Sequence, residues 1–477
     1  MNQILHSIDG TVFTVGDAIL QYSYLLAAIF FVIGLKLQSH PNSARRGNIW
    51  AGAGMLLAMV TTLLLHKDNN GHYISIANAS VVISVFVVGS VIGAVVARRV
   101  KMTAMPQLVS FYNATGGAAS ALVATMEFYN PENKAMLVTL LGLVIGSLTF
   151  SGSMIAYGKL DGKVGDIFSP VMKFVNITMI LILAALVVFL LYAGFDFPYR
   201  NLLSIILLFL ALLYGVLFVM PIGGADMPVV ISLLNSFSGI AAALAGFIYH
   251  NQAMILGGIL VGAAGTILTI LMCKAMNRSL LNVLIGAFGG GGAGPGGKEA
   301  GTIKEISVSD AAVLLSYSKK VVIIPGYGLA AAQAQHICSE LDKLLSEKGV
   351  EVKYAIHPVA GRMPGHMNVL MAEADVPYEK LIEMDDINPE MPNTDVAVVI
   401  GANDVVNPAA YNDPSSPIYG MPIINAYEAK NIIVMKRGMG KGYAAIENHL
   451  FYDDKTRMLF GNAKDTLQKL VAEIKTL

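Results

Sequence analysis

The stretch GAFGGGGAGPGGKEAG, residues 286–301, divides this chain of 477 residues into two parts. About nine long apolar runs precede it, and alternating strand-like and helix-like segments follow it. A soluble domain typically contains about 25% charged residues, whereas this chain contains 13%, so most of the first part is expected in lipid. We predict an α-helical transmembrane bundle of about nine helices over residues 1–285, a Gly-rich linker over 286–301, and an α/β domain with a parallel sheet over 302–477.

The apolar runs are long enough to cross a bilayer, which takes about 20 mostly apolar residues. The N-terminal segment MNQILHSIDGTVFTV has no basic region and no small-residue cleavage site, so we expect neither a signal peptide nor a transit peptide. The candidate spans are residues 18–37, 49–65, 74–97, 105–128, 135–157, 171–193, 202–220, 228–250 and 254–273.

The basic residues between the spans gather on one side of the membrane if there are nine spans. Cytoplasmic loops carry an excess of Lys and Arg, so this side is predicted to be cytoplasmic. The N-terminus is then outside, and the second part of the chain is in the cytoplasm. The basic side holds Lys36, Arg45, Arg46, Arg98, Arg99, Lys101, Lys159, Lys163, Lys173, Lys274 and Arg278, and the other side holds Lys67, Lys134 and Arg200.

Three polar residues in or beside the spans are candidates for a proton path. Asn113 and Asn235 lie in segments rich in small residues, which let helices approach closely. Each asparagine either makes hydrogen bonds between helices or lines a hydrated path, because polar groups inside a membrane are often functional. Asp226, just before a span, is either a helix N-cap or a proton relay. Asparagine carries no proton at neutral pH, so the titrating group must come from elsewhere.

A nucleotide-binding fingerprint follows the first predicted strand of the second part. After the apolar run 320–324, Gly326, Gly328 and Ala331 have the spacing G-x-G-x-x-A, and a helix is predicted to follow through about residue 348. In dinucleotide-binding folds the first Gly permits a tight turn, and the second lets the backbone approach a pyrophosphate. We therefore expect a Rossmann-like fold with phosphates at the helix N-terminus. The alternative is a helix-packing turn without a ligand.

The rest of the second part alternates between strands and helices, which is typical of a parallel sheet covered by helices. The connection 403–422 is rich in Asn, Asp, Pro and Ser, and long connections without secondary structure are often lids or binding loops. Asp404 at its start either acts on a cofactor or caps the following turn. Strands are predicted at 352–356, 396–400, 432–435 and 458–460, and helices at 367–374 and from 463.

The residues that follow the strands favour NADP(H) over NAD(H). An NAD site usually has Asp or Glu at the end of the second strand, where it binds the ribose 2′-hydroxyl. Here that strand is followed by His357 and a loop to Arg362 that contains no carboxylate. Arg362, Lys436 and Arg437 instead supply cationic donors suited to a phosphate.

The composition gives no indication of nucleic-acid or metal binding. The formal net charge is +0, so we expect no nucleic-acid partner. Cys273 and Cys338 lie far apart in different parts of the chain, which implies neither a disulfide framework nor a zinc site.

Several long runs together resemble the β subunit of the proton-translocating NAD(P) transhydrogenase family, over nearly the whole chain. The resemblance implies a Re/Si-specific enzyme that passes hydride from NADH to NADP⁺ while a proton moves from outside to inside. It also implies NADP(H) on this chain and no metal. The runs are GGADMPVV at 223–230, MCKAMNRS at 272–279, PGYG at 325–328, HPVAGRMPGHMNV at 357–369 and GAND at 401–404.

By this resemblance, residues of the second part would hold NADP(H). Lys436, Arg437 and Tyr443 would hold the 2′-phosphate, and Asp404 would lie near the nicotinamide, where it is the candidate catalytic residue. The full set is Gly326, Tyr327, Gly328, Ala331, His357, Val359, Ala360, Gly361, Arg362, Met363, Pro364, Gly401, Ala402, Asn403, Asp404, Val405, Gly420, Met421, Lys436, Arg437, Gly438, Met439, Gly440, Lys441, Gly442, Tyr443, Asn462 and Ala463.

The resemblance further implies a partner. This chain has no second glycine fingerprint with a downstream carboxylate, so an α subunit would supply the NAD(H) domain and further membrane helices. Many family members have a histidine where this chain has Asn113, and a histidine on the partner can serve instead; Asn235 and Asp226 match the family pattern. A dimer of αβ units in the bacterial inner (plasma) membrane is expected. The alternative is a transporter or channel whose Rossmann domain only senses nucleotide.

Overall fold

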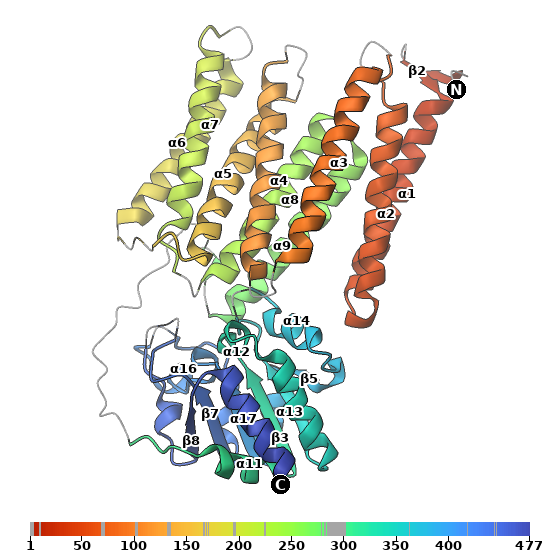
Figure 1. The fold of residues 1–477 in the computed structure, drawn as a ribbon. Helices are drawn as coiled ribbons and strands as arrows, with labels where there is room; N and C mark the ends of the chain where they lie inside the picture. Colours follow the sequence, from red (N-terminus) through yellow and green to blue (C-terminus); the bar gives the residue numbers. More distant parts are fainter. Residues whose placement is uncertain are drawn as a thin grey trace.

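The computed structural model consists of a helical bundle and an α/β part that lies below it (Figure 1). The predicted linker 286–301 lies outside the residues that the structure describes. Those residues are 4–8, 11–67, 72–100, 104–130, 135–165, 167, 169, 171–193, 197–223, 226–277, 279, 280, 283, 302–361, 363–416, 418–442, 444 and 446–477.

Nine long helices form the bundle in the described part of the chain, as predicted. Eight of them are long and apolar enough to cross a membrane; the ninth, α4, is richer in polar and small residues. The chain is therefore a multi-pass membrane protein. The helices are α1 (Val15–Gln38), α2 (Pro41–Leu65), α3 (Ile76–Arg99), α4 (Met105–Phe128), α5 (Met136–Leu160), α6 (Val171–Ala193), α7 (Arg200–Val219), α8 (Met227–Ile248) and α9 (Gln252–Ala275).

Glycines bring the backbones of neighbouring helices together, as is common in membranes. A Cβ atom on Gly117 of α4 would lie 2.8 Å from the carbonyl oxygen of Gly146 on α5. A Cβ on Gly258 of α9 would lie 2.7 Å from the carbonyl oxygen of Gly239 on α8. These helix pairs therefore pack through their backbones. Helix α3 differs, because none of its residues is buried within this chain.

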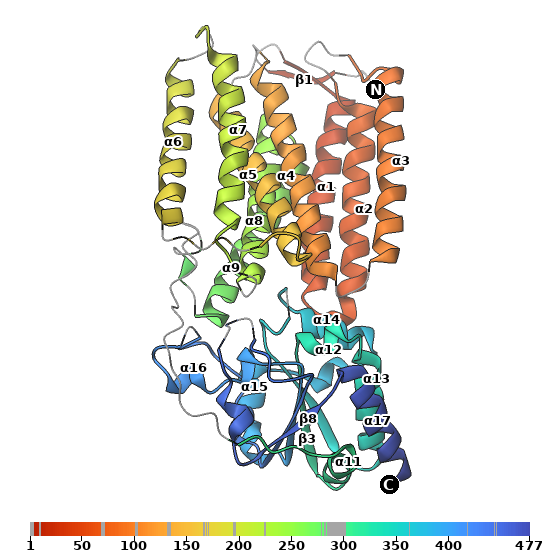
Figure 2. The same ribbon diagram turned by 60° about the vertical axis from the view of Figure 1, so that its left-hand side comes forward.

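A short antiparallel hairpin, which was not predicted, precedes the bundle. It consists of β1 (Ile4–Ile8) and β2 (Thr11–Thr14). Figure 2 shows this hairpin at the end of the bundle that is farther from the α/β part. Because an odd number of helices crosses the bundle, the chain leaves it at the end opposite to the one where it entered. The hairpin and the α/β part therefore lie at opposite ends.

The α/β part contains a six-stranded sheet in the order β5-β4-β3-β6-β7-β8, and all neighbouring strands are parallel. The chain adds two strands on one side of β3 and then returns to add three on the other. This order is the Rossmann order, so the predicted fold is confirmed. The strands are β3 (Lys320–Pro325), β4 (Glu351–Ile356), β5 (Leu381–Glu383), β6 (Val396–Ile400), β7 (Asn431–Lys436) and β8 (Thr456–Phe460).

Both faces of the sheet are buried. Val321 and Ile323 of β3 point into one core, which is covered by α11 (Val308–Ser316), α13 (Gln335–Glu347) and α17 (Ala463–Thr476). Val322 and Ile324 point into the other core, which includes α15 (Met384–Ile387). The remaining short helices are α12 (Tyr327–Ala331), α14 (His366–Glu373), α16 (Ala409–Asn412), η2 (Tyr378–Lys380), η3 (Asn388–Asn393), η4 (Asp404–Val406), η5 (Ala426–Glu428) and η6 (His449–Tyr452).

Two predictions of local structure were wrong. The helix expected through about residue 348 is broken into α12 and α13, because Gln333 has a φ of +52°, which a helix cannot contain. The connection 403–422 contains η4 and α16 and is not an unstructured loop. Its apolar side chains Ala409, Ala410, Ile418 and Met421 form a small core together with Ile423, which directly follows the connection.

Candidate functional site

Two glycine turns meet at the carboxyl edge of the sheet, where β3 and β6 end and the chain direction across the sheet reverses. Ligands of open α/β sheets bind at such a switch point. The N–H of Gly326 donates to the carbonyl of Ile400 at 2.9 Å, and the N–H of Gly328 donates to the carbonyl of Gly401 at 2.9 Å. A Cβ on Gly328 would lie 2.6 Å from the Cα of Gly401. Gly328 is therefore required for contact between the two turns, whether or not a pyrophosphate also approaches it.

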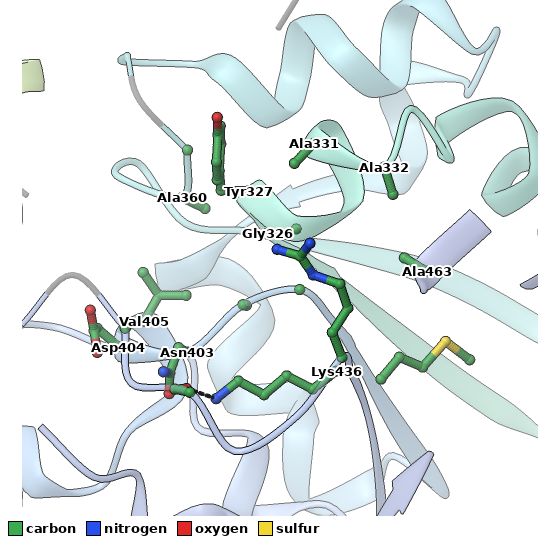
Figure 3. Close-up of a pocket in the computed structure, with 18 of the residues that line it drawn as sticks. Gly326, Tyr327, Ala331, Ala332, Ala360, Asn403, Asp404, Val405, Lys436 and Ala463 are labelled. Atoms are coloured by element: carbon green, nitrogen blue, oxygen red, sulfur yellow. Dashed lines mark hydrogen bonds between the residues drawn. The ribbon is translucent and has the colours of Figure 1, made fainter. Parts of the chain in front are cut away.

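A pocket of about 670 Å³ opens beside these turns. In Figure 3, Tyr327 and Ala331 lie on one side of it, and Asp404 and Lys436 lie on the other. The predicted residues that line it are Gly326, Tyr327, Gly328, Ala331, Val359, Ala360, Gly361, Gly401, Ala402, Asn403, Asp404, Val405, Lys436, Arg437, Gly438, Gly440, Lys441, Gly442, Asn462 and Ala463.

The other predicted residues stand apart from this lining. His357, Met363, Pro364, Gly420, Met421 and Met439 do not line the pocket, and Arg362 and Tyr443 lie outside the described residues. Sequence reasoning missed Ala332, Met435 and Gly461, which do line it. Gly461 could have been found, because it directly follows a strand, as Gly326 and Gly401 do.

The pocket carries more positive than negative charge. Lys436, Arg437 and Lys441 line it, and Asp404 is the one carboxylate among the described lining residues. Burial lowers the pKa of Lys436, and Asp404 opposes this effect. The Lys436 ammonium donates to the carbonyl of Gly440 and lies 4.5 Å from the centre of the Phe451 ring. Cationic donors on a glycine-rich loop suit a phosphate group.

Asp404 connects two loops of the pocket. Its Oδ2 accepts a hydrogen bond from the N–H of Ala444 at 3.0 Å, and a Cβ on Gly442 would collide with its carboxylate. Asn403 occupies the N-cap position of η4, one residue before Asp404. The Asp404 carboxylate holds the loop after β7 against the end of β6.

His357 has a structural position behind the pocket wall. Its side chain is buried, its Nε2 lies 2.8 Å from the carbonyl oxygen of Pro422, and its Nδ1 accepts from the N–H of Val359 at 3.2 Å. A carbonyl oxygen can only accept, so the proton of the neutral ring is on Nε2. Burial lowers the pKa of His357 to about 4, which keeps this ring neutral near pH 7.

A family model described as the NAD(P) transhydrogenase beta subunit matches residues 20–473. Two proteins from Rhodospirillum rubrum, each described as NAD(P) transhydrogenase subunit beta, are 45% identical to this chain over 465 residues, which is 94% of this chain and 97% of each of them. This chain belongs to the NAD(P) transhydrogenase beta subunit family. Nothing in the match favours the alternative of a transporter or channel with a nucleotide sensor.

In this member of the beta subunit family, Asn113 makes contacts between helices. Its side-chain Nδ2 on α4 donates to the carbonyl of Ile231 on α8 at 3.4 Å, and its own backbone carbonyl accepts from the hydroxyl of Ser238 at 3.2 Å. Asn235 lies between these two residues on the same face of α8 and is half-buried. The structure thus brings Asn113 and Asn235 to one interface.

Asp226 lies at the start of α8 and is buried, with 6% of its surface exposed. Its backbone carbonyl accepts from the N–H groups of Val229 and Val230, as at the N-cap of a helix. Its side chain makes no capping hydrogen bond. Asp226 is therefore the N-cap by position, while its carboxylate does not serve as the cap.

Proposed function

We propose that this chain is the proton-translocating, NADP(H)-binding subunit of a Re/Si-specific NAD(P) transhydrogenase. Hydride would pass from NADH, held by an α subunit, to NADP⁺, held by residues 302–477, while a proton moves inward through residues 1–285. The observation that carries the proposal is a cation-lined pocket at the Rossmann switch point in a chain of the beta subunit family.

The choice of NADP(H) follows from the charges around the pocket. Strand β4, the neighbour of β3, ends at Ile356 and is followed by His357, so the carboxylate that would bind a ribose 2′-hydroxyl is absent there. Arg437 and Lys441 are exposed at the opposite rim, where a 2′-phosphate would find donors. We expect Arg362 and Tyr443 to complete this set.

Hydride transfer between two nicotinamides needs no acid or base, so the protein has to position the rings and exclude competing reactions. Asp404 is proposed to act near the nicotinamide by holding Gly442 and Ala444 in place. Neither the pocket lining nor the other described residues contain a group of three or more His, Cys, Asp or Glu side chains that could hold a metal ion.

Proton movement would supply the energy that changes NADP(H) binding. One charge moved through 100 mV is worth about 2.3 kcal/mol, which changes a two-state population about fiftyfold. We propose that Asn113 and Asn235 position water along the path and that Asp226 is its relay nearest the α/β part. Because asparagine does not titrate, the titrating group is proposed to come from a histidine of the α subunit, as the family resemblance implies.

The proposed setting is the inner membrane of a bacterium, with the N-terminus outside and residues 302–477 in the cytoplasm. The 286–301 linker would let the NADP(H) domain reorient, and the working unit would be a dimer of αβ pairs. The odd number of long helices in the described part of the bundle and the excess of Lys and Arg on one side support this orientation.

Nucleotide binding to the purified full-length chain tests the proposal. Arg437→Ala is expected to weaken NADPH binding by about 10- to 100-fold, the value of a hydrogen bond to a charged group, and to leave NADH binding unchanged. Arg457→Ala, on β8 and outside the pocket lining, is the matched control and should bind NADPH like the wild type. Binding can be followed by the fluorescence of the reduced nucleotide. Wild-type protein that binds NADH as tightly as NADPH would contradict the proposal.

A further inference from the structure

Residues 419–422 lie between the last membrane helix and the wall of the pocket. Asn277 follows α9 in a left-handed conformation with a φ of +49°, and its side-chain Nδ2 donates to the carbonyl of Tyr419 at 2.7 Å. Both overall views place the α/β part directly below the end of the bundle where α9 finishes (Figures 1 and 2). The amide of Asn277 therefore joins the end of the bundle to this segment.

Gly420 is shaped to receive this amide. It has a φ of +75°, and a Cβ at this position would collide with the side-chain nitrogen of Asn277. Its own N–H donates to the carbonyl of Ala410 at 2.8 Å, which fixes it to α16. A residue other than glycine would be strained here and would push the amide of Asn277 away.

The far end of the segment is held by the pocket loop. Pro422 offers its carbonyl to the Nε2–H of His357, and the Nδ1 of the same ring accepts from the N–H of Val359. One buried, neutral ring thus joins residue 422 to residue 359. Because both ring nitrogens are used, the segment and the loop cannot shift independently without the loss of a buried hydrogen bond.

Val359 completes the connection. Its side chain lines the pocket, and it packs against both the apolar core of the bundle and the core of the sheet. The end of the bundle is therefore in contact with the pocket wall by two routes, through the packing of Val359 against the bundle core and through Asn277, residues 419–422 and His357.

We propose that Asn277 is a positioning residue that transmits the state of the membrane bundle to the nucleotide pocket, through residues 419–422 and His357. The inference rests on the proposed function, because it names the link through which proton passage would alter NADP(H) binding. Asn277 touches neither the pocket nor the asparagine pair of the bundle. Its substitution should therefore affect coupling and not the chemistry.

The test uses the αβ complex reconstituted in sealed vesicles. A proton gradient is imposed in the direction that drives the reduction of NADP⁺ by NADH. Asn277→Gly removes the amide and keeps the left-handed backbone, and Asn277→Asp keeps the shape without the donor. When no gradient is applied, both variants should reduce an NADP⁺ analogue with NADH at the wild-type rate, within about twofold. In both variants, the factor by which the gradient raises the rate should be at least about threefold smaller than in the wild type. This loss is within the range of one neutral hydrogen bond.

Asn412→Ala is the control, since Asn412 is an exposed asparagine in the same connection and should keep the full stimulation. Wild-type stimulation in both Asn277 variants would overturn the inference alone. Loss of the basal rate in both variants would assign Asn277 a structural role and would also overturn it. A wild-type complex without any gradient stimulation would overturn the proposed coupling, and the inference with it.

Discussion

The membrane bundle and the α/β part use small and large residues in opposite ways. In the bundle, Gly239 and Gly258 let α8 and α9 touch through their backbones, while many large apolar side chains face outward, such as Val88 on α3, which is 58% exposed. In the α/β part, large apolar side chains such as Ile323 are fully buried. Lipid already solvates apolar groups, so burial of Leu or Val gains little in a membrane, whereas close backbone contact does stabilise the bundle.

The difference is expected to be largest for the loss of a large side chain. Ile323→Ala should lower the free energy of unfolding of the α/β part by about 4 kcal/mol, because it leaves a cavity in the sheet core. Val88→Ala on the exposed face of α3 should have almost no effect. Pulse proteolysis of the full chain in detergent with increasing urea measures both. Equal sensitivity at the two positions would contradict the comparison.

The second largest effect is expected for the addition of a single methyl group in the bundle. Gly239→Ala should destabilise the bundle by about 3 kcal/mol, because its Cβ would meet the backbone of α9, which cannot move aside. Gly116→Ala on α4 is the matched control, since nothing lies within 4 Å of that site. The thermal midpoint in detergent should fall for Gly239→Ala and stay level or rise slightly for Gly116→Ala.

A smaller effect, confined to the α/β part, is expected from acid. Burial lowers the folded-state pKa of His357 from 6.5 to about 4, so the unfolded chain binds more protons between these values. The stabilisation is complete above about pH 6.5 and is lost as the pH falls towards 4, which amounts to about 2 kcal/mol by pH 5. Urea midpoints at pH 7 and pH 5 measure it.

Substitutions of His357 sharpen this prediction. His357→Gln can still donate to Pro422 from the Nε2 position, whereas His357→Asn can replace only the acceptor for Val359. Both variants should show less loss of stability on acidification than the wild type, because neither side chain titrates. His336→Gln, an exposed position on α13, should keep the wild-type pH dependence. An unchanged acid response in both His357 variants would remove His357 as the cause.

Much of the fold could be predicted because its signals are local. Long apolar runs specify membrane helices by length alone, and strands such as 396–400 were predicted with the observed bounds. The broken helix at Gln333 could not be predicted, because its residues favour a continuous helix and only contacts between the turns impose the left-handed residue. The fold of the connection 403–422 was missed for a similar reason, since its small core exists only after the chain has closed on itself.

In the candidate site as well, some residues could be predicted from local signals and others could not. Gly326, Gly328 and Lys436 were found from the sequence because strand ends and glycine spacing mark the carboxyl edge of a parallel sheet. The sequence did not distinguish Gly420 and His357, which lie behind the pocket, from residues that line it. A loop residue can point towards the pocket or away from it with the same local sequence.

By itself, the sequence determined that this chain has a membrane bundle, a Rossmann sheet and a glycine edge with cationic residues, because periodicity, length and turn chemistry depend on near neighbours. Only the tertiary structure decided what Gly328, His357 and Asn277 contact, since their partners lie at Gly401, Pro422 and Tyr419, far along the chain or on another element. Such pairings arise from packing in three dimensions, and no local pattern encodes them.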